Sequence, residues 1–449
     1  MHEKILPLFS TPPPKVCVHG HVRGEPRDAA EAGARNARVV NSQRLFTSER
    51  SKADASAPSE GQALHTREHI PPKATIVVAM SGGVDSSVTA ALLKKAGYDV
   101  IGLFMKNWEE EDQDGVCTIT EDYTDVIRVA DRLQIPHYAC NFSKEYKSLV
   151  FDHFLAELQK GRTPNPDILC NQKIKFKRLL EVAKQLGGSF LATGHYAQIE
   201  QKDSTFALMK AADATKDQTY FLYTICQDAL SHTLFPIGGL KKKEVRAMAK
   251  EFGLATAQKK DSTGICFIGE RNFSSFLSQY LPYSPGNFEL VDGTAVGKHK
   301  GIAYYTIGQR KGLGLGGEGE AWFVVGKNVE RNAVIVARGH LHPALFADTL
   351  IAKNPHWVAG ALPFKPPFFC SAKIRYRQPD QPCVVEEIQD SGQILTVRFM
   401  QPQRAITEEQ SIVFYLKNCC LGGAIIEKRG PSYFEQQKRL PDIVSDSAT

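Results

Sequence analysis

The stretch TIVVAMSGGVDSSVTAALLKKAG, residues 75–97, contains a change of pattern that decides the fold. An apolar run predicts a buried strand, which ends at Ser81-Gly82-Gly83, and a helical pattern then continues to Gly97. The two glycines allow a tight turn and a close approach of the backbone to a ligand. Amides at the start of the helix point outward with the positive end of the helix dipole. The turn is therefore predicted to bind an anion.

Two common phosphate-binding motifs do not describe this turn. It lacks the spacing and the lysine of GxxxxGK[ST], and it is not the GxGxxG turn of dinucleotide-binding folds. Ser81, Ser86 and Ser87 add hydroxyl donors, which suit pyrophosphate better than a carboxylate. We therefore expect a site for nucleotide phosphates, and the alternative is an ordinary glycine turn after a strand.

Strands and helices alternate after this turn. The patterns predict strands at DVIGLFM (99–105), HYACNF (137–142) and SFLATG (189–194), and helices at DYTDVIRVADRLQI (122–135) and over about 171–186. This order predicts an α/β fold with a doubly wound, mostly parallel sheet. A ligand of such a sheet lies beyond the carboxyl ends of the strands.

The pattern changes from about residue 286 onward. Short alternating runs punctuated by glycine occur at GIAYYTIGQRKGLGLGG (301–317), AWFVVGKNV (321–329), AVIVARG (333–339), FFCSAKIRYR (368–377) and ILTVRFM (394–400). They predict two small β-rich modules, of which the second is a barrel.

The composition narrows the class of protein and its expected location in the cell. The 449 residues are 42% hydrophobic and have a net charge of +6, which permits a nucleic-acid partner without establishing one. No apolar run is long enough for a membrane helix, and no secretion signal opens the sequence, so a cytoplasmic protein without membrane contact is expected. None of the 10 cysteines forms a CxxC pair, and we expect most of them to be reduced.

The first 72 residues differ from the rest. They are rich in Arg, Ala, Ser and Pro, have no sustained apolar pattern and are predicted to be disordered. A mitochondrial transit peptide is the alternative, and acidic residues such as Glu25, Asp28 and Glu31 disfavour it. The predicted segments are the extension 1–72, a catalytic α/β domain 73–280, a β-rich central domain 281–345, a C-terminal β-barrel 346–428 and a flexible tail 429–449.

A second motif, GRTPNPDILCNQKIKFKRLL, spans residues 161–180. Prolines stiffen its first part, Asp167 is expected to cap the next helix, and Cys170 falls in the first turn ahead of several lysines. A helix N-terminus and nearby cations both favour the thiolate, so a lowered pKa and a nucleophilic role are predicted for Cys170. The alternative is a small buried core cysteine.

A third motif, KKDSTGICFIGERNF, spans residues 259–273. Cys266 lies in a stretch rich in Gly, Ser and Thr that predicts a mobile loop. Mobility suits a cysteine that accepts sulfur from a donor and delivers it inward, and such a cysteine needs a second thiol to break the resulting S–S bond. Taken without the other motifs, Cys266 would be interpreted as a core cysteine.

The first motif resembles the PP-loop of the N-type ATP pyrophosphatases, which activate an oxygen as an adenylate and release pyrophosphate. The three motifs in this order resemble the bacterial tRNA-specific 2-thiouridylases. The resemblance runs from about 73 to 428, with further matches at GLFMKNW, ATGHYA, KDQTYFLY, YTIGQRKGLG, KIRYRQ and CLGGAII. It implies an enzyme that replaces the C2 oxygen of the wobble uridine with sulfur in lysine, glutamate and glutamine tRNAs.

The resemblance also implies the residues of the site. The implied ATP-binding residues are Ala79, Met80, Ser81, Gly82, Gly83, Val84, Asp85, Ser86, Met105 and Gly194. Asn165, Pro166 and Asp167 would meet the target base. The implied tRNA contacts are His195, Lys216, Asp217, Gln218, Arg375, Tyr376 and Gln410, although His195 could equally be a satisfied histidine at a strand end. The family usually has Gly in place of Ala79, and TPGQ in place of the TEEQ that ends at Gln410.

The implied mechanism has two stages. ATP with Mg²⁺ adenylates the C2 oxygen, and sulfur from a persulfide on Cys266 then replaces it, either directly or as hydrosulfide released when Cys170 attacks the persulfide. Asp167 would act as an acid or base or orient the uridine, and no metal ligand is assigned within the chain. A sulfur-relay protein would load Cys266, the β-rich modules would hold the anticodon stem-loop, and a Cys170–Cys266 disulfide would be a by-product.

Two other classes of function stay open. One is a different PP-loop enzyme acting on tRNA, such as one similar to lysidine synthetase, which does not require the cysteine pair. The other is a non-catalytic tRNA-binding protein that has kept the fold.

Overall fold

A computed structural model of the chain describes residues 70–108, 118–261 and 273–441. The predictions for the N-terminal extension, for Cys266 and its loop, and for the end of the C-terminal tail lie outside the described residues.

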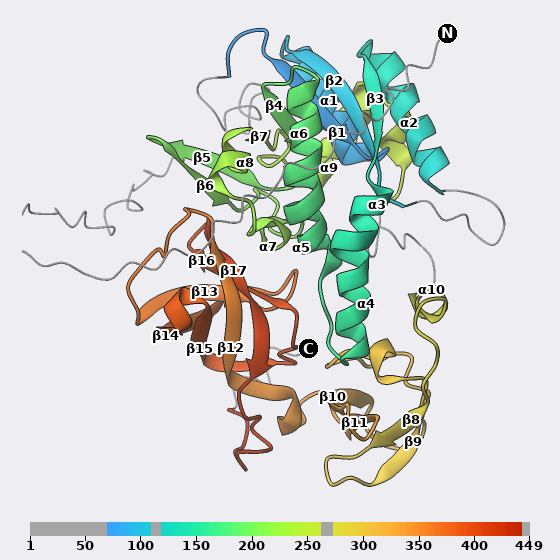
Figure 1. The fold of residues 1–449 in the computed structure, drawn as a ribbon, viewed down its shortest axis with the longest axis vertical. Helices are drawn as coiled ribbons and strands as arrows, with labels where there is room; N and C mark the ends of the chain where they lie inside the picture. The colour runs from blue at the N-terminus through green and yellow to red at the C-terminus, as the bar shows by residue number, and fades with distance from the viewer. Residues whose placement is uncertain (1–69, 109–117, 262–272, 442–449) are drawn as a thin grey trace, which may run out of the picture. The chain divides into compact units, whose positions relative to one another are not determined.

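The first part of the described chain contains a parallel five-stranded sheet (Figure 1). Its strands are β1 (Thr75–Met80), β2 (Asp99–Lys106), β3 (His137–Asn141), β4 (Phe190–Thr193) and β7 (Thr233–Leu234), in the order β3-β2-β1-β4-β7. All neighbouring strands are parallel. The strand order reverses between β1 and β4, so the predicted ligand position lies at their carboxyl ends.

Helices cover both faces of this sheet (Figure 1). Successive side chains of a strand point to opposite faces, so apolar strands need packing partners on each. Ile76, Val78 and Met80 of β1 pack with α1 (Val84–Lys95), α2 (Thr118–Leu133) and α9 (Lys242–Glu251). Val77 points the other way, into a core shared with α6 (Leu180–Gln185). The predicted doubly wound α/β architecture is confirmed.

The helices of the second face form two continuous runs, 143–159 and 166–185, joined by residues 160–165. They are α3 (Ser143–Tyr146), the π-helix Lys147–Phe151, α4 (Asp152–Gln159), α5 (Pro166–Cys170), the π-helix Asn171–Leu179 and α6. The helix predicted from about 171 starts earlier, at Pro166, because proline is favoured in the first turn of a helix. Four short helices follow before the later modules: α7 (Thr219–Leu222), α8 (Gln227–Ser231), the 3-10 helix Ala255–Gln258 and α10 (Phe273–Ser278). Single 3-10 turns also occur at Ile302–Tyr304, Pro343–Leu345 and Asp390–Gly392.

A separate four-stranded sheet follows, with the order β10-β11-β8-β9. Its strands are β8 (Gly286–Glu289), β9 (Ala295–His299), β10 (Trp322–Asn328) and β11 (Ala333–Arg338). We call these strands and their connections the central module. The alternating run 301–317 was predicted as β structure, and this is wrong: it contains a 3-10 turn at Ile302–Tyr304 and then a loop with several glycines at positive φ. Such a backbone does not continue a strand ladder.

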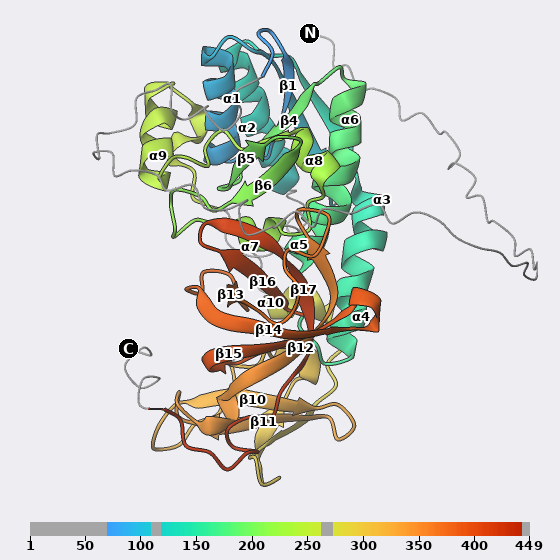
Figure 2. The same ribbon diagram turned by 90° about the vertical axis from the view of Figure 1, so that its left-hand side faces the viewer.

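The last module is a closed antiparallel barrel, as predicted (Figure 2). Its strands are β12 (Phe346–Trp357), β13 (Phe368–Lys373), β14 (Gln381–Gln389), β15 (Ile394–Arg404), β16 (Ser411–Leu416) and β17 (Cys419–Arg429). Pairing of β12 with β17 closes it. The hairpin of β5 (Gln198–Lys202) and β6 (Thr205–Met209), which follows β4 in the chain, pairs through β6 with β17. The barrel sheet therefore includes strands from the first part of the chain.

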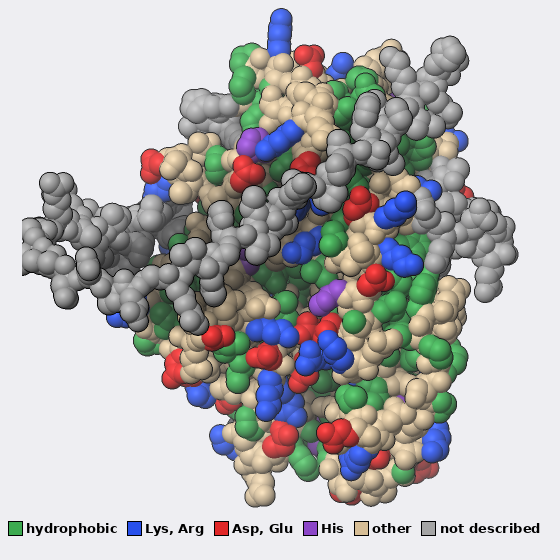
Figure 3. All heavy atoms as spheres, in the orientation of Figure 1, with side chains coloured by type: hydrophobic (Ala, Val, Ile, Leu, Met, Phe, Trp, Pro, Cys, Tyr) green, Lys and Arg blue, Asp and Glu red, His purple; other side chains and the backbone are tan. Residues whose placement is uncertain are grey.

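The surface has no strong charge of one sign on the face drawn in Figure 3, where Lys and Arg side chains lie among Asp and Glu side chains. This distribution agrees with the mild net charge of +6. Within the part of the chain that the structure describes, no helix has the length and apolar character needed to cross a membrane.

Candidate functional site

The turn after β1 is held by its own serines. The Ser81 amide donates to Ser86 Oγ at 3.1 Å, and Ser87 Oγ donates to the Gly83 carbonyl oxygen at 2.8 Å. Gly82 has φ +75°, and a Cβ atom there would lie 2.4 Å from the carbonyl oxygen of Asp122 in α2. Only glycine fits this position without displacing the backbone of α2.

The end of β4 lies directly against the same turn. A Cβ atom on Gly194 would lie 2.7 Å from the amide nitrogen of Ser86 and 2.8 Å from the carbonyl carbon of Asp85. The residues predicted to bind ATP are thus brought together at the carboxyl ends of β1, β2 and β4: Ala79 and Met80 end β1, Ser81 to Gly83 form the turn, Val84 to Ser86 begin α1, Met105 lies near the end of β2, and Gly194 follows β4.

Asp85 is held by two residues from other elements. Lys242 Nζ, at the start of α9, lies 2.7 Å and 2.8 Å from the two carboxylate oxygens of Asp85. Tyr196 Oη donates to Asp85 Oδ1 at 2.9 Å. Burial and the neighbouring Asp85 charge raise the pKa of Tyr196, so this phenol stays protonated and remains a donor.

Several cations converge beside the turn. Asp261 accepts from Lys216 at 2.7 Å and from Arg246 at 2.6 Å, and Lys242 lies 2.8 Å from it. Burial opposes ionisation of Asp261, but the hydrogen bonds from Lys216 and Lys242 outweigh it and lower the pKa to about 2. Lys242, Arg246, Tyr196 and Asp261 were not among the predicted site residues. Lys242 is separated from Asp85 by 157 positions, so no local pattern indicates the pair.

The helix that bears Cys170 begins differently from the prediction. Asn165, not Asp167, is the N-cap residue: its Oδ1 accepts from the amides of Asp167 at 3.2 Å and Ile168 at 3.4 Å. Asn165 is placed one residue before Pro166, where a short side chain reaches the free amides of the first turn. Cys170 ends α5 and is 0% exposed, within the core that covers this face of the sheet.

His195 follows β4 and packs between aromatic rings. Its Nδ1 lies 2.8 Å from Thr193 Oγ1, and its ring centroid is 5.8 Å from that of Phe176. Burial lowers the pKa of His195 well below its usual value, and the charge of Lys175 adds to the effect. A neutral ring is therefore present at physiological pH.

The segment Lys216–Gln218 joins several parts of the molecule. Lys216 pairs with Asp261, and the Gln218 side-chain carbonyl accepts from the Tyr196 amide at 2.8 Å. Asp217 is buried, accepts from Thr219 Oγ1 at 2.9 Å and lies 3.5 Å from Lys373 Nζ of the barrel.

Arg375 and Tyr376, which follow β13, also make contacts within the chain. Arg375 Nη2 donates to the carbonyl oxygens of Ile307 at 2.7 Å and Ala405 at 3.1 Å. Burial lowers the pKa of Arg375, with a contribution from Arg404. The Tyr376 ring centroid lies 4.5 Å from that of Phe221. Gln410 Nε2 donates to the Thr163 carbonyl oxygen at 2.7 Å, just before α5.

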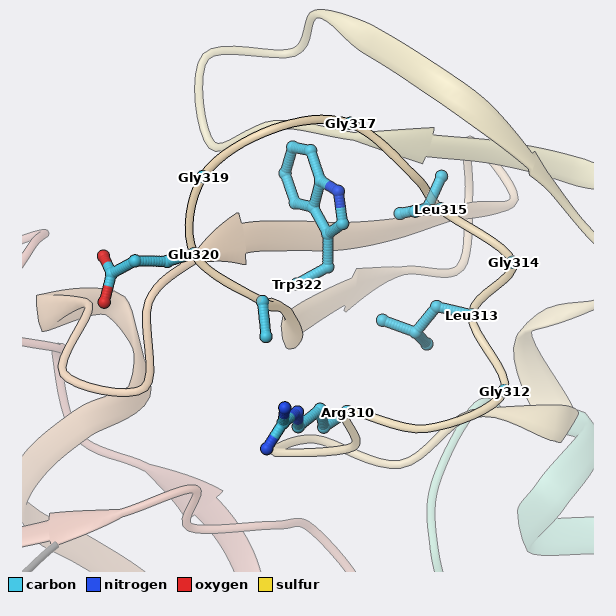
Figure 4. Close-up of a pocket in the computed structure, with 10 residues that line it drawn as sticks. Arg310, Gly312, Leu313, Gly314, Leu315, Gly317, Gly319, Glu320 and Trp322 are labelled. Carbon is cyan, nitrogen blue, oxygen red and sulfur yellow. The ribbon is translucent and has the colours of Figure 1, made fainter. Parts of the chain in front are cut away.

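A pocket of about 280 Å³ lies in the central module, apart from these residues (Figure 4). A glycine-rich loop forms its rim, and Arg310, Leu313 and Trp322 line it. The Arg338 guanidinium stacks over the Trp322 ring, 4.2 Å from its centroid. It also donates to the carbonyl oxygens of Gly316 and Glu320 in the loop. None of the residues predicted to form the site lines this pocket.

A sheet of this strand order, with SGGVDSS joining its central strand to the next helix, defines a PP-loop ATP pyrophosphatase, a class that binds ATP at this turn. Three family models match successive parts of the chain: a tRNA methyl transferase HUP domain at 74–270, a tRNA methyl transferase PRC-barrel domain at 274–338 and an aminomethyltransferase beta-barrel domain at 347–426.

Three relatives are similar over nearly their whole length. The tRNA-specific 2-thiouridylase MnmA of Protochlamydia amoebophila is 58% identical over 82% of this chain and 97% of the relative. The proteins of the same name from Halalkalibacterium halodurans and Methylobacillus flagellatus are 54% and 56% identical, over 80% and 79% of this chain and 95% and 99% of the relatives. The chain belongs to the tRNA-specific 2-thiouridylase family.

Proposed function

We propose that this chain is an ATP-dependent tRNA-uridine 2-sulfurtransferase acting on the wobble uridine of lysine, glutamate and glutamine tRNAs. The observation that carries the proposal is the geometry of the α/β module. An anion-binding turn with Asp85 and Lys242 lies at its switch point, and the same module holds the Cys170 helix. Family membership supports the choice of tRNA as substrate.

In the first step, the uridine C2 oxygen attacks the α-phosphorus of ATP and pyrophosphate leaves. The serines and amides of the turn would hold pyrophosphate, and Lys216, Lys242 and Arg246 supply positive charge beside it. Mg²⁺ would accompany the phosphates and balance their charge. Asp85 is the carboxylate at the turn that could approach the ion, since Mg²⁺ needs only one or two protein carboxylates beside phosphate oxygens.

In the second step, sulfur replaces the activated oxygen. The terminal sulfur of a persulfide on Cys266 attacks C2, and AMP leaves with the original oxygen. The Cys170 thiolate then attacks the inner sulfur of Cys266, which frees the 2-thiouridine and leaves a Cys170–Cys266 disulfide for an external thiol to reduce. A sulfur-relay protein is the proposed source of the persulfide. The alternative is that Cys170 releases hydrosulfide first and this attacks C2.

The remaining predicted assignments stay part of the proposal, except that Gln410, whose side-chain amide donates to the Thr163 carbonyl oxygen, is not retained as a tRNA contact. Asp167, Asn165 and Pro166 would meet the target base at the start of α5, and the β-rich modules would hold the anticodon stem-loop. The domain boundaries predicted from the sequence are retained, except at the tail: β17 extends to Arg429, and Tyr433 packs in an apolar cluster with Phe346, so the described residues that follow the barrel are not a flexible tail. Since its proposed substrates, ATP and tRNA, occur in the cytoplasm, we place the enzyme there.

The test is mass spectrometry of tRNA nucleosides from cells that lack this protein, together with reconstitution of the purified chain with ATP, Mg²⁺, substrate tRNA and a persulfide donor. Loss of 2-thiouridine in the cells and its formation in the reconstituted reaction are expected. Activity that survives removal of both thiols would favour a different PP-loop enzyme. Absence of pyrophosphate release on mixing ATP with tRNA would favour a non-catalytic binding protein.

A further inference from the structure

The three residues Gly161–Thr163, between α4 and α5, contact both later modules. On the central-module side, Lys327 Nζ of β10 donates to the Gly161 carbonyl oxygen at 2.7 Å. Gly161 has φ +76°, and a Cβ atom there would lie 3.0 Å from methyl groups of Ile302 and Val329. The backbone therefore lies directly against the central module, at a distance that glycine allows.

On the barrel side, the next two peptide groups are bonded to the turn between β15 and β16. The Thr163 amide donates to the Glu408 carbonyl oxygen at 3.2 Å. The Gln410 side-chain amide donates to the Thr163 carbonyl oxygen at 2.7 Å. Both the amide and the carbonyl oxygen of Thr163 are thus hydrogen-bonded to one turn of the barrel.

Charged groups reinforce the same contact. Arg162 Nη1 lies 3.0 Å from Glu157 of α4 and 3.5 Å from Glu409 of the barrel turn. Glu409 also pairs with Lys353 at 2.6 Å, and it is 6% exposed. Its φ of +65° is unusual for a residue other than glycine. Its carboxylate is paired with two cations from different modules, Arg162 and Lys353.

These contacts end immediately before the residues proposed for catalysis. Asn165, two positions after Thr163, caps α5 through the amides of Asp167 and Ile168. Cys170 ends the same short helix. The start of α5 is therefore placed by a segment whose carbonyl groups are bonded to two other modules. A shift of about 1 Å in such a segment is enough to cost on the order of 100-fold in rate.

We propose that Lys327 and Gln410 are positioning residues for the sulfur-transfer step, because they hold Gly161 and Thr163 and thereby place α5, the short helix that begins beside Asn165 and ends at the buried Cys170. The inference rests on the proposed function and deepens it. Adenylation takes place at the turn after β1, which these two residues do not touch. Because the start of α5 also meets the base, their loss is expected to slow both steps. Sulfur transfer, which needs Cys170 as well, should slow more than adenylation, so that more of the adenylate is hydrolysed before sulfur arrives.

The readout is therefore the ratio of pyrophosphate released to 2-thiouridine formed, measured with full-length protein, substrate tRNA, ATP and a persulfide donor. In the wild-type protein this ratio is expected to be close to one. In Lys327→Met and in Gln410→Leu, we expect it to rise about tenfold, with the KM for tRNA within about twofold. Lys327→Arg retains a donor for the Gly161 carbonyl oxygen and is expected to restore most of the coupling.

Lys298→Met is the matched control, because Lys298 lies in the same module, is exposed, and donates from its ammonium group to the Asn287 side chain of that module. Its ratio should equal that of the wild type. A purely structural role would lower both products in proportion and leave the ratio unchanged, which overturns the inference.

An increase in the KM for tRNA at a ratio near one would show that Gln410 contacts tRNA and would also overturn the inference for that residue. The two variants are tested separately, so if one does not fold the other decides. If the wild-type protein forms no 2-thiouridine, the proposed function fails, and this outcome is distinct from an active wild type with coupled variants.

Discussion

Lys242 Nζ lies 2.7 Å from Asp85 Oδ1 and 2.8 Å from Asp261 Oδ1, so a single ammonium group joins the phosphate-binding turn to the segment that leads toward Cys266. The two carboxylates come from positions far apart in the chain. Both are negatively charged groups at the place where the proposed mechanism brings the phosphates of ATP. The ammonium group is therefore positioned to supply positive charge to the phosphates as well.

We expect Lys242→Met to lower ATP-dependent pyrophosphate release at least about tenfold, because it removes a partly buried cation beside the leaving group. Asp85→Ala should have a similar effect. Binding of tRNA, measured by filter retention, should change little. The neighbouring exposed residue provides the control, and Lys243→Met is expected to behave as the wild type. Unchanged pyrophosphate release in Lys242→Met would contradict the proposed role.

A second prediction concerns the glycine in the turn. Gly82→Ala places a methyl group against the Asp122 backbone at a positive φ, so both strain and a clash result. Gly97→Ala is the matched control, since Gly97 has φ +85° and no atom within 4 Å of the added Cβ. The control should cost about 1 kcal/mol of unfolding free energy from strain alone. Gly82→Ala should cost more and should also abolish pyrophosphate release. Equal effects in urea unfolding would show that the turn can move away from α2.

The sequence predicts the α/β fold well because the decisive signals are local. The apolar run of β1, the glycines after it and the helical pattern of α1 lie within one short stretch, and the structure shows the same elements there. The barrel strands are also predicted from the sequence, because their alternating patterns are local too. Local patterns also explain one error: both Asn165 and Asp167 favour an N-cap, and the start of the helix at Pro166 decides between them.

Long-range relationships were not predictable from local patterns. The pairing of β6 with β17 joins Leu208 of the first part of the chain to Cys420 of the barrel. The bond between Gln410 and Thr163 spans 247 positions. The glycine-rich run 301–317 has the alternation of a strand, but several of its glycines have positive φ, and two of them lie against distant residues, Gly308 against Ala405 and Gly317 against Arg338. Such contacts are determined by how distant segments meet.

A pH prediction follows from Asp261. Its folded-state pKa is lowered to about 2 from an ordinary value of 3.8, so its ion pairs stabilise the protein above about pH 4. This contribution is lost as the pH falls through 2. We expect Asp261→Asn to be less stable than the wild type in urea unfolding at pH 6, with the difference shrinking between pH 4 and pH 2. Asp99→Asn, at an exposed position, is the control. A difference independent of pH would contradict the prediction.

Deletion of residues 1–70 is expected to leave thiolation unchanged. The matched family models begin at residue 74, and the alignment with the Protochlamydia relative covers 97% of that protein with 82% of this chain. The deleted segment also has a composition with little capacity to form an apolar contact with the catalytic module. Thiolation rate and melting temperature of the truncated and full-length proteins provide the comparison. A clear loss of rate at an unchanged melting temperature would assign the extension a functional role.

The last prediction concerns the two cysteines proposed for sulfur transfer. Cys170→Ser and Cys266→Ser should each stop thiolation, because one thiol bears the sulfur and the other breaks the S–S bond. The two variants should differ in the intermediate that they accumulate. Cys170→Ser should still accept a persulfide on Cys266, whereas Cys266→Ser should bear no productive sulfur. Pyrophosphate release should survive in both, since it depends on the turn after β1.

Peptide mapping after a single turnover without reductant makes this test direct. The wild-type protein should show a peptide pair joined by a Cys170–Cys266 disulfide. Cys226→Ser is the control, because Cys226 is an exposed free cysteine at the N-cap of α8 and has no place in the mechanism. That variant should thiolate tRNA at the wild-type rate. If Cys266 never gains sulfur and the Cys170–Cys266 disulfide does not form, the two-cysteine mechanism is wrong, and sulfur must reach C2 by another route.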